Sequence, residues 1–254
     1  MYSNQSEYGL IGNPLTHSNS PDFYRQQFNI DFKLFPLQKI TDFPEFLLQH
    51  SDLKGFCVTI PYKEAILPYL HRLSDEAQQI GAVNCVKVER QGEKTLLHGY
   101  NTDTAGFAAL LSNRKLPDKA LLFGTGGASK AVAYTLASLS VTCQFVSRTK
   151  TGNNLIYSEI TPYLLQNYPL LINTTPVGMY PDTGALLPLP YEAITHRHWL
   201  IDLIYNPLET PFLKEGRIRG ARTQNGLTML HRQAELNWQI WKECPTHNNQ
   251  ISNV

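Results

Sequence analysis

Hydrophobic residues follow two patterns along this chain, and the two patterns alternate over most of its length. Short apolar runs are typical of buried strands, and apolar residues at every third or fourth position are typical of helices that pack on one face. In the first part of the chain, strands are predicted at residues 7–12, 31–37, 53–60, 83–88 and 96–100, and helices at 20–29, 43–50, 62–73 and just before Gly81. This alternation predicts an α/β domain with a small, mainly parallel sheet.

A second run of alternating elements follows a helix predicted at 104–111 and a linker at 116–119. In this run, strands are predicted at 120–123, 141–146, 170–173, 199–203 and 217–221, and helices at 128–136 and 227–241. The segment 151–168 has no clear helical pattern, so we expect this half of the chain to lack one crossover helix. The predicted fold class is therefore α/β throughout.

A glycine-rich turn joins the strand at 120–123 to the helix that follows it. The turn reads Gly124-Thr125-Gly126-Gly127-Ala128-Ser129. Glycines let the backbone approach a pyrophosphate, and the free N–H groups of a helix N-terminus attract its charge. Ser129 stands where the full dinucleotide fingerprint has a third glycine, and a simple connecting turn is the alternative interpretation.

The end of the next strand favours NADP over NAD. About 20 residues after the glycine turn, an acidic residue would hold the ribose of NAD. This chain has Ser147-Arg148-Thr149-Lys150 there, without an Asp or Glu. Arg148 and Lys150 suit the additional phosphate of NADP, and the alternative for Arg148 is a solvated loop residue.

Composition narrows the classes of partner. The chain has 254 residues, of which 42% are hydrophobic, and 22 Lys and Arg nearly balance 21 Asp and Glu. We therefore expect no nucleic-acid or membrane partner. Four scattered cysteines argue against a zinc site or a disulfide framework, and together with a polar N-terminus they favour the cytoplasm. Residues 244–254 are predicted to form a polar tail.

Three polar residues lie at predicted strand ends, where chemistry collects in open parallel sheets. They are Lys63, Asn84 and Asp103. Each could instead be a solvated side chain, and Asp103 could cap the next helix. Hydroxyl groups in neighbouring loops make that alternative less favoured, and they belong to Ser18, Ser20 and Thr59. Together these groups predict a pocket for a small, hydroxylated, anionic molecule.

Taken in order, the motifs of residues 6–243 resemble those of the shikimate dehydrogenase family. The glycine turn alone would not carry this resemblance, because many nucleotide-binding proteins share it. The motifs are Gly12-Asn13-Pro14, His17-Ser18-Asn19-Ser20-Pro21, Val58-Thr59-Ile60-Pro61-Tyr62-Lys63, Gly81-Ala82-Val83-Asn84, Asn101-Thr102-Asp103, Gly124-Thr125-Gly126-Gly127-Ala128-Ser129, Ser147-Arg148-Thr149, Asn173-Thr174-Thr175-Pro176-Val177-Gly178-Met179, and Asn225-Gly226-Leu227 with Met229-Leu230 and Gln233.

The resemblance implies a role for each matching residue. Lys63 and Asp103 would be the catalytic pair. The substrate carboxylate would be held by Ser18, Ser20 and Tyr205, and the ring hydroxyls by Thr59, Asn84 and Gln233. The cofactor would be bound by Gly124, Thr125, Gly126, Gly127 and Ala128 at the pyrophosphate, by Ser147, Arg148, Thr149 and Lys150 at the 2′-phosphate, and by Asp75, Leu203 and Gly226 at its border. The sequence departs from the family at Thr151-Gly152-Asn153-Asn154, where a fuller helix is usual, and at Thr228.

The resemblance also implies an organisation and a reaction. Residues 1–103 would form a substrate-binding domain to which helix 227–243 returns, and residues 104–226 a Rossmann-like NADP domain, with a cleft between them. The implied reaction is the reversible reduction of 3-dehydroshikimate to shikimate with NADPH, without a metal, in a monomer or homodimer. Two alternatives are a dehydrogenase for quinate or with relaxed cofactor use, and a non-catalytic NADP(H) sensor.

Overall fold

The computed structural model describes residues 6–15, 18–92, 94–112 and 114–243, so the predicted tail 244–254 and His17 lie outside the described residues. The strands are β1 (Glu7–Gly12), β2 (Phe32–Pro36), β3 (Leu53–Val58), β4 (Arg72–Leu73), β5 (Cys85–Gln91), β6 (Lys94–Tyr100), β7 (Lys119–Phe123), β8 (Thr142–Ser147), β9 (Leu155–Ile156), β10 (Leu170–Asn173), β11 (Trp199–Asp202) and β12 (Arg222–Gln224). The helices are α1 (Ser20–Phe28), α2 (Phe43–Gln49), α3 (Asp75–Ile80), α4 (Asp103–Leu111), α5 (Gly127–Ser138), α6 (Pro162–Gln166), α7 (Pro211–Ile218) and α8 (Leu227–Lys242), with short 3-10 turns η1 (Ile40–Asp42), η2 (Leu67–Tyr69), η3 (Tyr157–Glu159) and η4 (Tyr191–Ala193).

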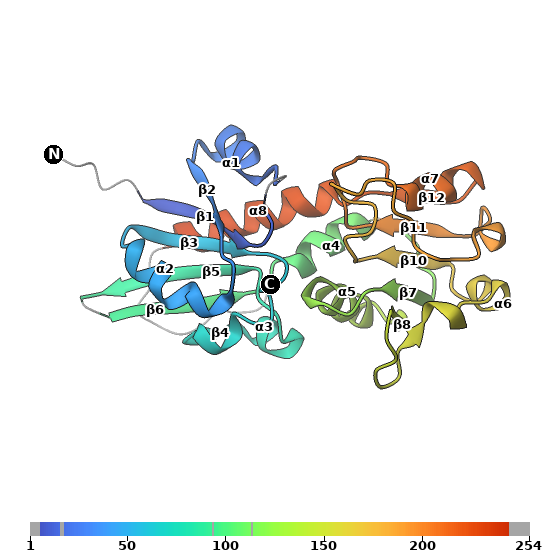
Figure 1. Ribbon diagram of the computed structural model, residues 1–254, viewed down its shortest axis with the longest axis horizontal. Helices are drawn as coiled ribbons and strands as arrows, with labels where there is room; N and C mark the ends of the chain where they lie inside the picture. The colour runs from blue at the N-terminus through green and yellow to red at the C-terminus, as the bar shows by residue number, and fades with distance from the viewer. Residues whose placement is uncertain (1–5, 16–17, 93, 113, 244–254) are drawn as a thin grey trace.

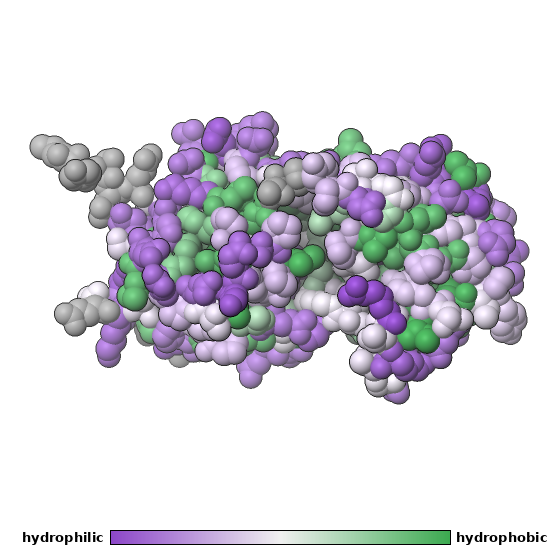
Figure 2. Space-filling model, viewed as in Figure 1, coloured by the Kyte–Doolittle hydropathy of each residue, from purple (hydrophilic) through white to green (hydrophobic). Residues whose placement is uncertain are grey.

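These elements form two six-stranded sheets. The strand order is β2-β1-β3-β5-β6-β4 in the first sheet and β12-β11-β10-β7-β8-β9 in the second. Figure 1 shows the sheets in opposite halves of an elongated molecule, with α4 and α5 between them and α8 running from one half to the other. The surface is hollowed between the two halves (Figure 2).

The first sheet is mainly parallel but contains one antiparallel strand. The pairs β1–β2, β1–β3 and β4–β6 are parallel, whereas β5 is antiparallel to both β3 and β6. The reason is the short turn between β5 and β6, because strands joined by a hairpin can only pair antiparallel. This reversal places the start of β5 beside the ends of β3 and β6.

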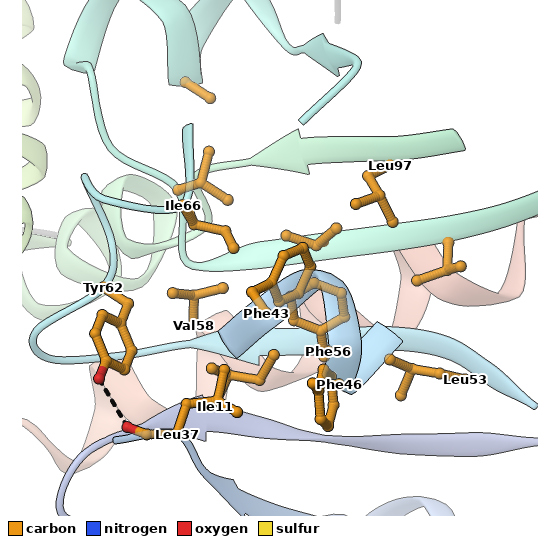
Figure 3. Close-up of a cluster of buried hydrophobic side chains, with 14 residues drawn as sticks. Ile11, Leu37, Phe43, Phe46, Leu53, Phe56, Val58, Tyr62, Ile66 and Leu97 are labelled. Carbon is orange, nitrogen blue, oxygen red and sulfur yellow. Dashed lines mark hydrogen bonds between the residues drawn. The ribbon is translucent and has the colours of Figure 1, made fainter. Parts of the chain in front are cut away.

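Side chains of the first sheet alternate between two apolar layers, as the period of a strand requires. Phe56 and Val58 point into a cluster with Phe43 of α2, where the Tyr62 hydroxyl donates to the Leu37 carbonyl at 2.7 Å (Figure 3). The intervening Cys57 points to the opposite layer, which α1 and α8 cover. Helices therefore cover both faces of this sheet.

The second sheet is parallel throughout. Along its central strand β7, Leu121 and Phe123 join one apolar layer, and Ala120 and Leu122 join the other. All four are fully buried, which accounts for the continuous apolar run in the sequence. The carboxyl ends of its strands face the first sheet's half, since α5 begins there and packs between the sheets (Figure 1).

Two predicted elements are wrong, and both errors involve a proline. Residues 62–73 form turns, η2 and β4 instead of an amphipathic helix. Pro68 has no N–H to continue a helix, and His71 N–H bonds to the carbonyl of Leu97 at 2.9 Å, which draws the chain into the sheet. The strand predicted at 217–221 is instead the last two residues of α7, which starts at Pro211, and the turn after it, and the strand β12 begins only at Arg222.

The start of α1 and the segment 151–168 can also be compared with the sequence predictions. Asn19 occupies the N-cap position of α1, and Ser20 is the first helical residue, as the helix predicted from residue 20 implied. The segment 151–168 holds β9, η3 and the five-residue α6, so a short helix is present where none was predicted. In the described ranges, no helix has the length and apolar character needed to cross a membrane.

The last helix, α8, packs on the first sheet although it follows the last strand of the second. Trp241 near its end donates to the carbonyl of Val86 in β5 at 3.0 Å. Ala234 and Trp241 are buried in the layer that also contains Tyr24 of α1. At its start, a Cβ on Gly106 of α4 would approach the Met229 carbonyl to 2.9 Å, so α4 and α8 lie in close contact.

Candidate active site

Three strand termini meet at the edge of the first sheet that faces the second. Val58 at the end of β3 donates its N–H to the carbonyl of Asn84 at 2.8 Å. Asn84 in turn donates its backbone N–H to the carbonyl of Tyr100, the last residue of β6, at 3.1 Å. The antiparallel placement of β5 therefore brings Asn84 beside the segments that carry Lys63 and Asp103.

Lys63 and Asp103 form a largely buried ion pair at this edge. The Lys63 Nζ donates to Asp103 Oδ2 at 2.5 Å, and the two side chains are 14% and 6% exposed. Asp103 is the first residue of α4, and its carboxylate points to Lys63 instead of capping the helix, whose N-cap is Thr102. Asn101 fixes this start, because its Oδ1 accepts the Asp103 N–H and its Nδ2 donates to the Ala82 carbonyl.

Asn84 joins this pair to α8. Its Nδ2 donates to Asp103 Oδ1 at 2.9 Å and lies 3.4 Å from the Gln233 Oε1. The four residues Lys63, Asn84, Asp103 and Gln233 are thus in one contiguous group, as the resemblance implied. A buried polar group of this kind is stable only because its members satisfy one another's hydrogen bonds.

The predicted carboxylate-binding residues lie at the start of α1. The Ser18 Oγ accepts the backbone N–H of Ser20 at 3.3 Å. Burial raises the pKa of Tyr205, which comes from the other half of the molecule, and the nearby backbone N–H of Asn19 opposes the shift. The structure therefore places Tyr205 beside the loop that holds both serines, while Thr59 directly follows β3 and packs on Gly12.

The glycine turn lies between β7 and α5 with the geometry that a pyrophosphate requires. Gly124 has φ of 113°, which a residue with a side chain rarely adopts. A Cβ added to Gly126 would meet no atom within 4 Å, so this backbone is open to a ligand. No side chain among the described residues caps the start of α5, which leaves its first N–H groups available. Thr125 and Ala128 lie in the same turn.

The start of α5 also touches the edge of the first sheet that carries Lys63 and Asp103. A Cβ added to Gly127 would lie 2.8 Å from the Lys63 Cβ and 3.2 Å from the Ala82 Cβ, so any larger residue would push the two halves apart. A phosphate group on this turn would therefore lie close to the segment that carries Lys63. The residues present fit a dinucleotide bound at the start of α5.

The residues predicted to bind the 2′-phosphate follow β8, but they are not equivalent. Arg148 is exposed, and Ser147 uses its hydroxyl to hold the Thr149 carbonyl. Lys150 is engaged, because its Nζ contacts both carboxylate oxygens of Glu159 at 2.7 Å. Arg148 is therefore better placed than Lys150 to meet a phosphate.

Buried polar groups hold the loops that follow β10 and β11. Asp202 is fully buried and accepts the Thr210 hydroxyl at 2.6 Å, the Ile204 N–H at 3.0 Å and the Asn173 Nδ2 at 3.1 Å. Burial raises the pKa of Asp202 to about 6, against the opposing effect of these donors. Asn173 also accepts the N–H and hydroxyl of Thr175, so the two side chains together shape both loops.

The remaining predicted cofactor residues are Leu203, Gly226 and Asp75. The carbonyl of Leu203 would lie only 2.1 Å from a Cβ on Gly226, so glycine is required where α8 begins. Asp75 is the exposed first residue of α3, whose N-cap is Ser74. Helix α3 lies against α5, where the Tyr134 hydroxyl donates to Gln79 at 3.2 Å.

Two further residues lie beside Lys63 and Asp103 and were not predicted from the sequence. Thr102 and Asn237 are 6% and 0% exposed, and the Thr102 hydroxyl donates to the Asn237 Oδ1 at 2.6 Å. Asn237 lies four residues after Gln233, so both face the same side of α8. That spacing was the available signal, but it acquires meaning only when α4 is known to pack against α8.

The architecture and this edge define a class of protein, the two-domain α/β oxidoreductases with a nucleotide-binding sheet. Comparison with known proteins narrows the class. A family model described as the shikimate dehydrogenase substrate binding domain matches residues 10–86. A shikimate dehydrogenase (NADP(+)) of Clostridium beijerinckii is 38% identical over 95% of this chain and 93% of its own length.

Solved structures agree with this comparison. Shikimate dehydrogenase 1 of Peptoclostridium difficile superposes with a TM-score of 0.81 at 33% identity, over 96% of this chain and 94% of that one. Shikimate 5-dehydrogenase of Thermus thermophilus, solved in complex with NADP(H) and shikimate, gives a TM-score of 0.79 at 32% identity, over 93% of each chain. The chain belongs to the shikimate dehydrogenase family.

Proposed function

We propose that this protein catalyses the reversible NADPH-dependent reduction of 3-dehydroshikimate to shikimate, a step of aromatic amino acid biosynthesis. The observation that carries the proposal is the Lys63–Asp103 pair, 2.5 Å apart and largely buried, beside the start of α5. A positioned acid and base next to a dinucleotide site is what a dehydrogenase of an alcohol needs. The curated relatives named above carry the same activity in their names.

The proposed chemistry divides between the cofactor and the ion pair. A bound nicotinamide exchanges hydride with the ring carbon that carries the oxygen. Lys63 faces that oxygen, stabilises its negative charge during reduction and delivers the proton. In oxidation the pair accepts the proton of the alcohol, with Asp103 keeping Lys63 in place. Because Lys63 and Asp103 are largely buried, their charges interact in a medium that is less polar than water.

Substrate and cofactor residues follow from the same geometry. We assign Thr59, Asn84 and Gln233 to the ring hydroxyls, and Ser18, Ser20 and Tyr205 to the carboxylate. The nearness of Tyr205 to Asn19, which lies between the two serines, supports the second group. We assign the backbone of 124–128 to the pyrophosphate and Arg148 to the 2′-phosphate, with Lys150 contributing charge while it remains bonded to Glu159.

The organisation of the chain supports a division of labour between its two sheets. We propose that residues 1–103, with residues 227–243, form the substrate and catalytic unit, and that residues 104–226 form the cofactor unit. The packing of α8 on the first sheet supports this division. We further propose a cytoplasmic protein that acts on small molecules as a monomer or homodimer.

The test is spectrophotometric and uses the whole chain. Purified protein is mixed with shikimate or quinate and with NADP⁺ or NAD⁺, and formation of the reduced nicotinamide is followed by its absorbance. We expect turnover with shikimate and NADP⁺ to exceed every other combination. Faster turnover with quinate or NAD⁺ would assign a related dehydrogenase, and binding of NADP⁺ without turnover of either alcohol would assign a sensor.

A further inference from the structure

We propose that Asn237 is a positioning residue that sets the orientation of the Gln233 amide, so that Gln233 presents an N–H rather than a carbonyl to the substrate. Asn237 lies one helical turn beyond Gln233 on α8 and is fully buried. The inference rests on the proposed function, because it assigns Gln233 to a substrate hydroxyl. It adds a residue that makes no contact with the substrate itself.

The backbone N–H of Thr102 can only donate a hydrogen bond. That N–H lies 2.7 Å from one side-chain atom of Asn84, which must therefore be the amide oxygen Oδ1. The other end of the Asn84 amide is then Nδ2, which donates to Asp103 Oδ1 and to the Thr102 Oγ1, both at 2.9 Å. A backbone group thus fixes which way the Asn84 amide points, without reference to any assigned rotamer.

The Thr102 hydroxyl fixes the orientation of the Asn237 amide in a similar way. This oxygen accepts from Asn84, and its single proton has two acceptors within reach, the Asn237 Oδ1 at 2.6 Å and the Asn84 Oδ1 at 3.2 Å. The shorter contact has the length of an O–H···O bond and is too short for an N–H···O bond, so the hydroxyl donates to the Asn237 Oδ1. The Asn237 Nδ2 must then point the other way. It donates to the Gln233 Oε1 at 2.9 Å, with the Cys57 Sγ at 3.1 Å and the Tyr24 hydroxyl at 3.4 Å beyond it.

The consequence falls on Gln233. Its Oε1 accepts from the Asn237 Nδ2 at 2.9 Å and cannot be exchanged with Nε2 without opposing donor to donor. The Asn84 Nδ2 lies further away, at 3.4 Å, and directs its two protons to Asp103 and Thr102. Its Nε2 uses one proton on the Leu230 carbonyl at 3.0 Å. The second N–H of Gln233 has no acceptor among the described residues, and it is the group that we assign to a substrate hydroxyl.

Asparagine is the residue type that this position requires. It must accept from a hydroxyl on one side and donate to a carbonyl on the other, within the volume between α4 and α8. Aspartate accepts on both sides while it is ionised, and leucine offers neither bond. A protonated aspartate, however, can accept from Thr102 with one oxygen and donate to Gln233 with the other.

This difference gives a sharp test, which uses Asn237→Asp. While the new carboxyl is ionised, its oxygen faces the Gln233 Oε1 and favours the reversed amide, so the KM for shikimate should rise at least about fivefold, the scale of one lost or opposed hydrogen bond. Lowering the pH to protonate the carboxyl should return the KM toward that of the wild type. Asn237→Leu should raise the KM without that pH dependence, and the Kd of NADP⁺ should stay unchanged in both.

The groups that face position 237 allow this interpretation of the pH profile. Burial raises the pKa of Cys57 to about 12 and also raises the pKa of Tyr24, so both stay neutral in the assay. Burial likewise raises the pKa of Cys85 behind them. The charged groups beyond Thr102 are Asp103 and Lys63, which wild type and variant share. The ratio of variant KM to wild-type KM therefore reports the new carboxyl.

Controls separate positioning from damage to the helix or to the proposed function. Gln239→Ala changes an exposed residue of α8 and should leave the KM and kcat unaltered. A second measurement, independent of turnover, is the NMR signal of the Gln233 side-chain amide, which is assigned by its loss in Gln233→Glu. In Asn237→Asp this signal should shift at neutral pH and return toward its wild-type position at low pH. A pH-independent KM ratio together with unshifted amide signals would overturn the inference, whereas an inactive wild type with the expected amide signals would overturn only the proposed function.

Discussion

The two halves of this molecule use buried polar groups for different purposes. At the edge of the first sheet, the buried side chains of Asn84, Thr102 and Asp103 form a hydrogen-bonded group, and two of them, Asn84 and Asp103, are themselves proposed binding and reactive residues. At the edge of the second sheet, the buried Asn173 and Asp202 bond to loop backbone and to hydroxyls, and they lie behind the surface that would meet a ligand. There, the ligand-facing groups are open backbone at Gly126 and exposed side chains.

The difference follows from what each edge must do. Proton transfer requires groups that are held within hydrogen-bond reach before the substrate arrives, and mutual bonding of buried groups provides that order. A dinucleotide instead makes many contacts with backbone N–H groups and with a few charges, so loop shape matters more than any one side chain. Removing a group should therefore affect chemistry in the first half, and stability or affinity in the second.

The largest effect should come from Lys63→Ala. We expect the kcat to fall by roughly 10²–10⁴-fold, the usual range for loss of a positioned acid or base. The loss should appear in kcat more than in KM, since the contact matters most while charge develops on the oxygen. NADP⁺ binding should change little, whereas the unfolding midpoint should fall, because the buried Asp103 carboxylate loses its cationic partner. Steady-state kinetics and urea unfolding measure both.

Asp103→Asn sharpens this prediction through a double-mutant cycle. Because Lys63 and Asp103 form one hydrogen-bonded unit, the double variant should be little slower than the slower single variant. Multiplicative losses would instead mean that the two residues act independently. A near-normal kcat in Lys63→Ala would place the chemistry elsewhere and remove the contrast between the two halves.

The next largest effect concerns Asp202, where the comparison predicts a loss of stability and not of chemistry. Asp202→Ala leaves the Thr210 hydroxyl, the Ile204 N–H and the Asn173 amide without their acceptor, and each buried donor left unpaired costs about 1–3 kcal/mol. Urea unfolding should show a lower midpoint, while substrate KM changes less than stability does. A stable variant with impaired kcat would show that the buried groups of both halves act on the reaction.

The pH dependence of stability tests the same residue in a different way. The folded-state pKa of Asp202 is raised from 3.8 to about 6, so protonation favours the folded state. The stabilisation from this proton is fully present below the unfolded pKa and is lost as the pH rises through 6, a change of about 3 kcal/mol from the size of the shift. Asp202→Asn cannot titrate, so the stability of wild type relative to this variant should fall between pH 4 and 7. A flat difference would contradict the raised pKa.

The elements of the fold that could be predicted were those whose patterns are local. Apolar runs located the central strands β3, β7 and β10, and the glycine turn located the start of α5. The helix predicted at 62–73 failed because its apolar spacing was real but Pro68 and the pairing of β4 with β6 took the backbone elsewhere. Thr210 followed by Pro211 is a local helix-start signal for α7, and it was not used when a strand was predicted at 217–221.

Arg148→Ala should have a moderate effect, confined to the second half. We expect NADP⁺ binding to weaken by about 1.5–3 kcal/mol, the scale of a hydrogen bond to a charged group, and NAD⁺ binding to change much less. Isothermal titration with both cofactors measures this. Lys150→Ala is the matched comparison, and its effect should be smaller because Lys150 is bonded to Glu159. Equal losses for both cofactors in Arg148→Ala would refute its assignment to the 2′-phosphate.

The candidate site shows where prediction from sequence stops. Lys63, Asn84 and Asp103 could be singled out because each follows or precedes a predicted strand. Gln233 was assigned only through the family resemblance, and Asn237 was missed, because nothing in the sequence shows that α8 returns to the first sheet. Likewise, Lys150 was grouped with Arg148 by position, and only the contact with Glu159 distinguishes the two.

The smallest effect should come from the ion pair that joins the two halves. Lys130 of α5 contacts Glu64, the residue after Lys63, at 2.5 Å, and the side chains are 39% and 42% exposed. Solvent screens a pair this exposed, so Lys130→Ala and Glu64→Gln should each change the free energy of unfolding by less than about 1 kcal/mol, and the coupling in a double-mutant cycle should vanish at high salt. Gly127→Ala is the sharper probe of the same boundary, because its Cβ would press on the Lys63 Cβ and should reduce kcat where the exposed pair does not. If loss of the Lys130–Glu64 ion pair reduced kcat as much as Gly127→Ala does, surface charge rather than close packing would set the spacing between α5 and Lys63.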